Sequence, residues 1–262
     1  MQAAMQESST NRTVWGGRIL SGLMVAFLVF DAAIHLVRIA PVVEAFGQLG
    51  VPLSFAVPLG LIELVAVGLY VYPRTSILGA ILLTAYLGGA VATQLRVGNP
   101  VFGQALFPIY VGVLLWGGLW LREARLRTQI PLTLVSAAPT NKILWAGRLV
   151  SAFPALAILF GAVVKVLVLP PVIDGFRKAG FPDYLVPIVG TIELVCTLVY
   201  LVPRTRVLGA ILLAGLMGGA TATNLRVGDP SYVATVILGV LAWGGLYLRD
   251  TRLRALIPLR AK

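Results

Sequence analysis

The sequence is poor in the residue types on which many redox and haem sites depend. It contains one cysteine, Cys196, and one histidine, His35. A single cysteine cannot form a disulfide within the chain, and thiol–disulfide exchange needs two thiols, so a dithiol redox centre built from this chain alone is excluded. A single histidine likewise excludes a haem held by two histidines of one protomer.

Charged residues are also scarce. They make up 12% of the 262 residues, whereas 58% are hydrophobic, and the mean hydropathy is +0.92. A soluble domain of this length needs more charge on its surface, so the composition indicates a membrane protein. The net charge of +11 does not indicate nucleic-acid binding, because the basic residues form short clusters beside apolar runs, as in proteins oriented in a lipid bilayer.

An internal repeat organises the chain. Residues 59–100 and 189–230 align without a gap, and more than half of the aligned positions are identical, which indicates a duplication. Each copy carries one glutamate in an apolar run, a Pro-Arg-Thr turn, a glycine-rich segment and a terminal arginine. The paired charged residues are Glu63 and Glu193, then Arg96 and Arg226.

The apolar runs predict an all-α membrane protein with two tandem, parallel four-helix transmembrane bundles. We expect a polar and disordered tail over 1–13, repeats over 14–131 and 144–262, and a cytoplasmic linker over 132–143. The expected spans are 14–40, 54–72, 75–95 and 104–122, then 144–169, 184–202, 206–225 and 231–249. Thr75 and Thr205 suit helix N-caps because each directly follows Pro-Arg. The first copy has three extra residues between Pro100 and Trp116.

The distribution of Lys and Arg predicts the orientation. Most of these 21 residues fall on the side shared by the two termini, the linker and the Pro-Arg-Thr turns. The positive-inside rule therefore predicts that both termini are cytoplasmic. Four spans per copy is an even number, so the copies run in the same direction, related by an axis along the membrane normal.

Helical spacing places polar residues on shared faces. Asp31 and His35 are four residues apart on the first span, so they lie on one stripe. Glu63 with Tyr70, and Glu193 with Tyr200, share a stripe on the second span of each copy. The third spans carry stripes of small residues that predict close packing within each bundle.

A charge in the bilayer costs about 2.5–3.5 kcal/mol and needs a partner or a wet cavity. We therefore expect Glu63 to face His35 or Arg96. The corresponding groups for Glu193 are Lys165 and Arg226. Removing Glu63 would then leave a basic group unpaired. His35 aligns with Lys165, but Asp31 aligns with a glycine, so only the first copy offers an Asp–His–Glu set for proton transfer.

Several motifs resemble those of the DoxX-like family of small bacterial membrane proteins. They include W-x-G-R-[IL], I-E-L, P-R-T-x-x-L-G-A-I-L-L, G-G-A-x-A-T-x-L-R and W-G-G-L-x-L-R, and they cover almost the whole chain twice. The resemblance implies a tandem fusion of a four-helix unit in the bacterial inner membrane. The family name comes from a subunit of a thiosulfate:quinone oxidoreductase, so the resemblance also implies quinone-linked redox chemistry and a redox partner subunit.

Three functions stay open at this point. The first is a protein that binds a lipophilic molecule, such as a quinone, at a buried Glu/Arg site formed by Glu63, Tyr70, Arg96, Lys165, Glu193, Tyr200 and Arg226. The second is an intramembrane acid–base enzyme, an isomerase, cyclase or hydrolase, that uses Asp31, His35 and Glu63. The third is a scaffold or small transporter whose ion pairs are structural. No built-in cofactor and no metal site are assigned.

Overall fold

The computed structural model describes residues 2–127, 130 and 142–254. Over these residues the regular structure is entirely helical, so the expected all-α architecture is confirmed. The first repeat consists of α1 (Gln2–Val37), α2 (Ala40–Gln48), η1 (Leu53–Phe55), α3 (Ala56–Val71), α4 (Ser76–Arg96), η2 (Val101–Ala105), α5 (Phe107–Arg122) and α6 (Ala124–Arg127). The second consists of α7 (Lys142–Val166), α8 (Pro170–Lys178), α9 (Leu185–Leu201), α10 (Arg206–Arg226), α11 (Tyr232–Arg249) and α12 (Thr251–Arg254).

Eight of these helices correspond to the expected membrane spans. Within the described residues, seven helical segments are long and apolar enough to span a bilayer, and α9, with 17 residues, is a shorter apolar helix. The α9 helix is the repeat equivalent of α3, which reaches spanning length together with η1. At 1.5 Å per residue, α9 covers about 25 Å of the hydrocarbon core.

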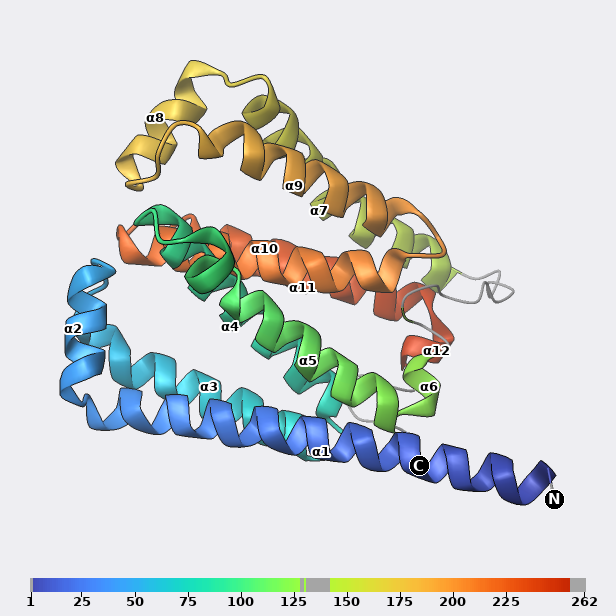
Figure 1. Cartoon of the computed structure of the whole chain (residues 1–262). Coiled ribbons are helices and arrows are strands. Elements are labelled where there is room, and N and C mark those ends of the chain that lie inside the picture. Colours follow the sequence, from blue (N-terminus) through green and yellow to red (C-terminus); the bar gives the residue numbers. More distant parts are fainter. Residues whose placement is uncertain (1, 128–129, 131–141, 255–262) are drawn as a thin grey trace.

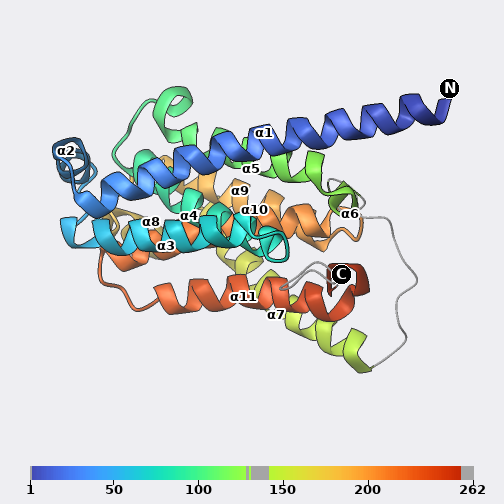
Figure 2. The same ribbon diagram turned by 90° about the horizontal axis from the view of Figure 1, so that it is seen from below.

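The two repeats run in parallel (Figure 1). In both views α2 and α8 lie at one end of the bundle, whereas α6 and the start of α1 lie at the other (Figures 1 and 2). The α4 and α10 helices lie side by side at the centre and run in the same direction, with α1–α3 and α7–α9 on opposite sides of this pair (Figure 1).

Glycines bring α4 and α10 into contact. A methyl group added to Gly88 would lie 2.0 Å from the carbonyl oxygen of Gly215, and one added to Gly218 would lie 1.9 Å from that of Ala85. Gly88 corresponds to Gly218 in the repeat, and Ala85 to Gly215, so the contact is reciprocal, as in a two-fold dimer. The small-residue stripes predicted to centre each bundle therefore form the interface between the repeats.

One helix start and one type of capping contact differ from expectation, although Thr75 and Thr205 are N-cap residues as predicted. Residues 1–13 were expected to be a disordered tail, but α1 already begins at Gln2, because the helix of the first span continues into the polar segment. Thr75 is the N-cap residue of α4, but it makes no side-chain capping bond. Its hydroxyl instead donates to the carbonyl oxygen of Leu69 at 2.7 Å, and Thr205 repeats this with Val199 at 2.7 Å.

Short helices at the end opposite α6 were not predicted. Arg38 and Val168 have φ values of 55° and 52°, a left-handed conformation that is rare for a β-branched residue such as valine. These residues turn the chain out of α1 and α7 into α2 and α8. The three extra residues after Pro100 lie in the region of η2, a π-helical turn before α5. The expected linker falls largely outside the described residues, since α7 already begins at Lys142.

Candidate functional site

The two intramembrane glutamates occupy equivalent positions on α3 and α9. The exposed fraction is 0% for Glu63 and 8% for Glu193. In each repeat the neighbouring outer helix, α1 or α7, packs against the glutamate helix. The surroundings of the two carboxylates therefore depend on which side chains of α1 and α7 lie next to Glu63 and Glu193.

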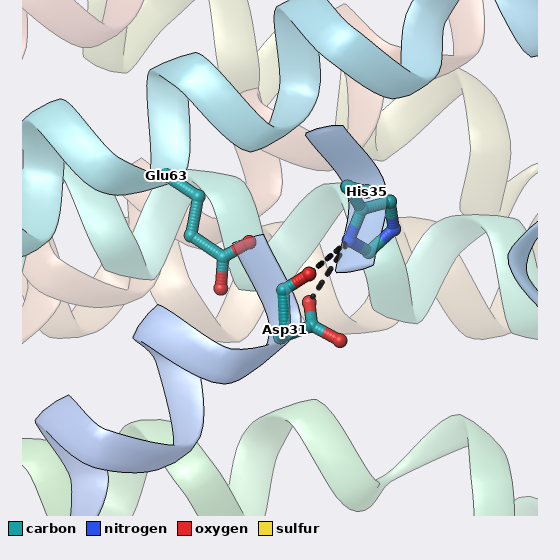
Figure 3. A group of neighbouring side chains, drawn as sticks. All are labelled: Asp31, His35 and Glu63. Atoms are coloured by element: carbon teal, nitrogen blue, oxygen red, sulfur yellow. Dashed lines mark hydrogen bonds and ion pairs between the residues drawn. The ribbon is translucent and has the colours of Figure 1, made fainter. Parts of the chain in front are cut away.

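In the first repeat α1 presents a carboxylate and an imidazole (Figure 3). The His35 Nδ1 atom lies 2.7 Å from the backbone carbonyl oxygen of Asp31 and 3.5 Å from its Oδ2 atom. A carbonyl oxygen only accepts hydrogen bonds, so Nδ1 carries the hydrogen in this geometry. The Asp31 carbonyl therefore holds the imidazole beside the Asp31 side chain.

Glu63 points from α3 toward Asp31 (Figure 3). One ligand-type atom from each of Asp31, His35 and Glu63 lies within 4.8 Å of the others. The Tyr86 hydroxyl, from α4, donates to Glu63 Oε2 at 3.0 Å. The Oε1 atom is buried and has no hydrogen-bond partner among the described residues. The predicted Asp–His–Glu set is thus gathered in one place, but no lysine or arginine forms an ion pair with it in the described part of the chain.

In the second repeat the glutamate has a cation. Lys165 Nζ donates to Glu193 Oε2 at 2.8 Å and to the carbonyl oxygen of Gly161 at 3.2 Å. The expected pairing of Lys165 with Glu193 is therefore present. A methyl group added to Gly161 would lie 3.4 Å from Nζ, so the small residue in place of Asp31 leaves room for the ammonium group.

Arg96 and Arg226 do not pair with the glutamates, contrary to expectation. Arg96 donates to the carbonyl oxygen of Leu49, the C-cap residue of α2, and Arg226 donates to that of Ala179, the C-cap residue of α8. Each arginine is the last residue of its span. Carbonyl groups at a helix C-terminus lack partners and attract cations, so the side chains extend outward, away from the membrane interior.

Tyr70 and Tyr200 are held by the protein itself. Both are 0% exposed. The Tyr70 hydroxyl donates to the carbonyl oxygen of Leu115 at 2.9 Å, and the Tyr200 hydroxyl donates to that of Ala242 at 2.9 Å. Each therefore ties the second span of its repeat to the fourth, and the predicted ligand contact at these residues stays a prediction.

A cavity of about 1060 Å³ lies between the repeats. It is lined by α4 and α5 of the first repeat and by α7 to α11 of the second, mostly with apolar side chains. Lys165 and Glu193 lie in its wall. The lining extends from Phe176 on α8, at one end of the bundle, to Trp120 near the other end of α5. The Lys165–Glu193 ion pair thus places two charged side chains in the wall of a long, mainly apolar cavity.

Sequence reasoning missed Tyr86 as a partner of Glu63 and missed the cavity. Tyr86 corresponds to Leu216 in a stretch where the two repeats are otherwise similar. A polar residue present in only one copy was the available signal. The cavity had no such signal, because it depends on how far α7, α8 and α9 stand from α4 and α5.

Comparison with known families gives a direct result. The family model described as the DoxX-like family matches residues 19–118 and again residues 149–245. Together these two matches cover well over half of the chain. The chain belongs to the DoxX-like family. Searches of curated proteins and of solved structures found no match. This DoxX-like protein is a multi-pass integral membrane protein that contains the family unit twice.

Proposed function

We propose that this DoxX-like protein binds one lipophilic molecule in the cavity between its repeats, with a polar end at Lys165 and Glu193. The observation that carries the proposal is the position of this ion pair on the wall of a mainly apolar cavity of about 1060 Å³. Ligand pockets for small molecules combine an apolar lining with a few convergent polar groups, in volumes of roughly 300–1,000 Å³.

A quinone fits this combination. Its carbonyl oxygen can accept a hydrogen bond from the Lys165 ammonium group, and the hydroxyl of the corresponding quinol can donate to the Glu193 carboxylate. An isoprenoid tail would lie along the apolar lining between α5 and α10. The proposed site differs from the predicted pairing of Glu193 with Arg226, because Arg226 lies on the carbonyl of Ala179. A redox partner subunit would follow from quinone binding and is part of the proposal.

A cavity-filling variant tests the proposal. Ala157 lines the cavity on α7, and the first repeat has Phe27 at the equivalent position, so Ala157→Phe fills the space without touching the ion pair. Decylubiquinone should quench the fluorescence of Trp116 and Trp120, which line the cavity. We expect saturable quenching in the wild type and at least about tenfold weaker binding in the variant.

The matched control is Val163→Phe, which adds the same side chain at an exposed position of α7. It should bind like the wild type. Cys196 also lines the cavity and is the only cysteine, so bound quinone should slow its alkylation by N-ethylmaleimide. Equal quinone affinity in Ala157→Phe and the wild type would overturn the proposal.

The acid–base alternative for Asp31, His35 and Glu63 stays a prediction. Its support is that these side chains gather within 4.8 Å, within reach of a substrate proton after small movements. The scaffold alternative is supported by the reciprocal α4–α10 contact, which needs no ligand.

A further inference from the structure

We propose that the first repeat holds a divalent metal ion of the zinc class, bound by Asp31, Glu63 and His35. The site lies between α1 and α3, and none of these residues lines the cavity proposed for the lipophilic molecule. The metal site therefore goes beyond that proposed function and does not depend on it. No metal site was expected from the sequence, because it did not reveal that Glu63 lacks a basic partner.

The buried carboxylate is the first observation. Glu63 is 0% exposed, and its Oε1 atom has no hydrogen-bond partner among the described residues. Its carboxylate points toward Asp31 (Figure 3), and one ligand-type atom from each of the three side chains lies within 4.8 Å of the others. A buried polar group without a partner is costly, so this oxygen is in position to be satisfied by a ligand.

The second repeat supplies the charge argument. There, one carboxylate faces one ammonium group at 2.8 Å, so the pair is neutral. In the first repeat, the lysine is replaced by His35 and the glycine by Asp31. Two carboxylates then lie together, and no lysine or arginine of the described chain pairs with either. A divalent cation restores the neutrality that Lys165 gives to the second repeat.

The ligand atoms indicate the class of metal. Two carboxylates and one imidazole suit zinc and its neighbours better than magnesium or calcium, which prefer oxygen ligands only. Three protein ligands also leave a fourth position open, as in zinc sites that bind water or substrate. Ligand atoms on a tetrahedral zinc ion lie roughly 3.4 Å apart, so ligand atoms that lie within 4.8 Å of one another must close by up to about 1.4 Å. The imidazole must also turn from the Asp31 carbonyl to offer a nitrogen.

An ion can reach the site from one side. The exposed fraction of the side chain is 33% for Asp31 and 16% for His35. Asp31 lies about 9 Å, at 1.5 Å per residue, from the end of α1 that leads into α2. The metal would therefore enter through Asp31 and come to rest against the buried Glu63.

Metal binding to the full chain tests the proposal. Protein purified in detergent is stripped with EDTA, desalted and titrated with zinc sulfate, and the bound zinc is counted by mass spectrometry after a second desalting. We expect one equivalent per chain and a higher melting temperature with zinc. Asp31→Asn and Glu63→Gln should each weaken binding at least about 100-fold. Glu193→Gln, the matched change in the second repeat, should still bind one equivalent.

Exchange of residues between the repeats gives a second test that does not rely on damaging the fold. Asp31→Gly combined with His35→Lys gives the first repeat the residues of the second and should produce a stable protein without bound zinc. Gly161→Asp combined with Lys165→His should produce a second site and two equivalents. The proposal is overturned if folded wild type binds no zinc, which would mean that protons neutralise the carboxylates, or if the Asp31→Gly, His35→Lys protein still binds it.

Discussion

Glu63 and Glu193 occupy equivalent positions on α3 and α9, but their neighbours differ. Glu193 faces an ammonium group at 2.8 Å, whereas Glu63 faces a tyrosine hydroxyl at 3.0 Å and a second carboxylate. Few substitutions account for the difference, since Asp31, His35 and Tyr86 stand where the second repeat has Gly161, Lys165 and Leu216. A duplicated scaffold can thus keep one buried acid twice and give each copy a different electrostatic environment.

The interface between the repeats kept its reciprocal glycine contacts. Gly88 and Gly218 contact opposite backbones in the same way, so the pseudo-two-fold axis is intact while the sites on either side differ. Such an arrangement lets one half of the protein change without disturbing the other, because the shared α4–α10 contact positions both.

Loss of the Lys165 ammonium group should cause the largest decrease in the free energy of unfolding. Lys165→Met leaves the Glu193 carboxylate buried without a cation, and breaking such a pair costs about 3–5 kcal/mol. We expect a loss near the lower value, because the Lys165 side chain is 20% exposed. In EDTA-treated protein, His35→Met, at the equivalent position, should cost no more than about 1 kcal/mol, since it removes one hydrogen bond. Thermal unfolding in detergent measures both, and equal losses would contradict the difference between the repeats.

A methyl group added in the α4–α10 interface should cause the next largest decrease in the free energy of unfolding. Gly88→Ala places a carbon 2.0 Å from the Gly215 carbonyl oxygen, which forces the helices apart and should cost at least about 2 kcal/mol. Gly218→Ala, the reciprocal change, should cost the same within about 0.5 kcal/mol. Gly68→Ala is the control, because an added methyl group there meets nothing within 4 Å. A wild-type melting temperature for Gly88→Ala would rule out the close contact.

The sequence predicted the spans well because hydrophobic length and the Pro-Arg-Thr and Gly-x-Pro breaks are local signals. The expected segment 75–95 corresponds to α4 (Ser76–Arg96), for example. Partner choice was harder to predict. Lys165 was identified, because it lies on the helix next to Glu193, but Arg96 was assigned to Glu63 on charge alone. A carbonyl group at the C-terminus of α2 accepts a hydrogen bond from the guanidinium group instead, and no sequence signal had indicated that α2 is a helix.

Neutralising the glutamates should change stability in opposite directions. The sequence predicted that losing Glu63 would leave a basic group unpaired, but no basic side chain among the described residues forms an ion pair with Glu63. In EDTA-treated protein, Glu63→Gln removes repulsion from Asp31, and its amide can still accept from Tyr86. We expect no loss, or a gain of up to about 1 kcal/mol. Glu193→Gln leaves Lys165 without its carboxylate and should be destabilising. If both variants unfold at equally lowered melting temperatures, the two glutamates do not differ in their electrostatic environment as proposed.

The smallest effect is expected at a surface ion pair that only the second repeat has. Arg177 Nη2 lies 2.6 Å from Asp183 Oδ2, where the first repeat has Gly47 and Leu53. The hydrogen bonds from Arg177 lower the pKa of Asp183. A lowered pKa in the folded state gives stability that is present near neutral pH and lost as pH falls below about 4.

Both side chains of this surface pair are well exposed, at 61% for Arg177 and 49% for Asp183, so water screens the interaction. Asp183→Asn should therefore leave the melting temperature at neutral pH within experimental scatter, and any small difference from the wild type should shrink as pH falls below about 4. A loss approaching that of Lys165→Met would mean that the second repeat depends on its surface charges as much as on its buried ones. The contrast between the repeats would then not reside in the membrane interior.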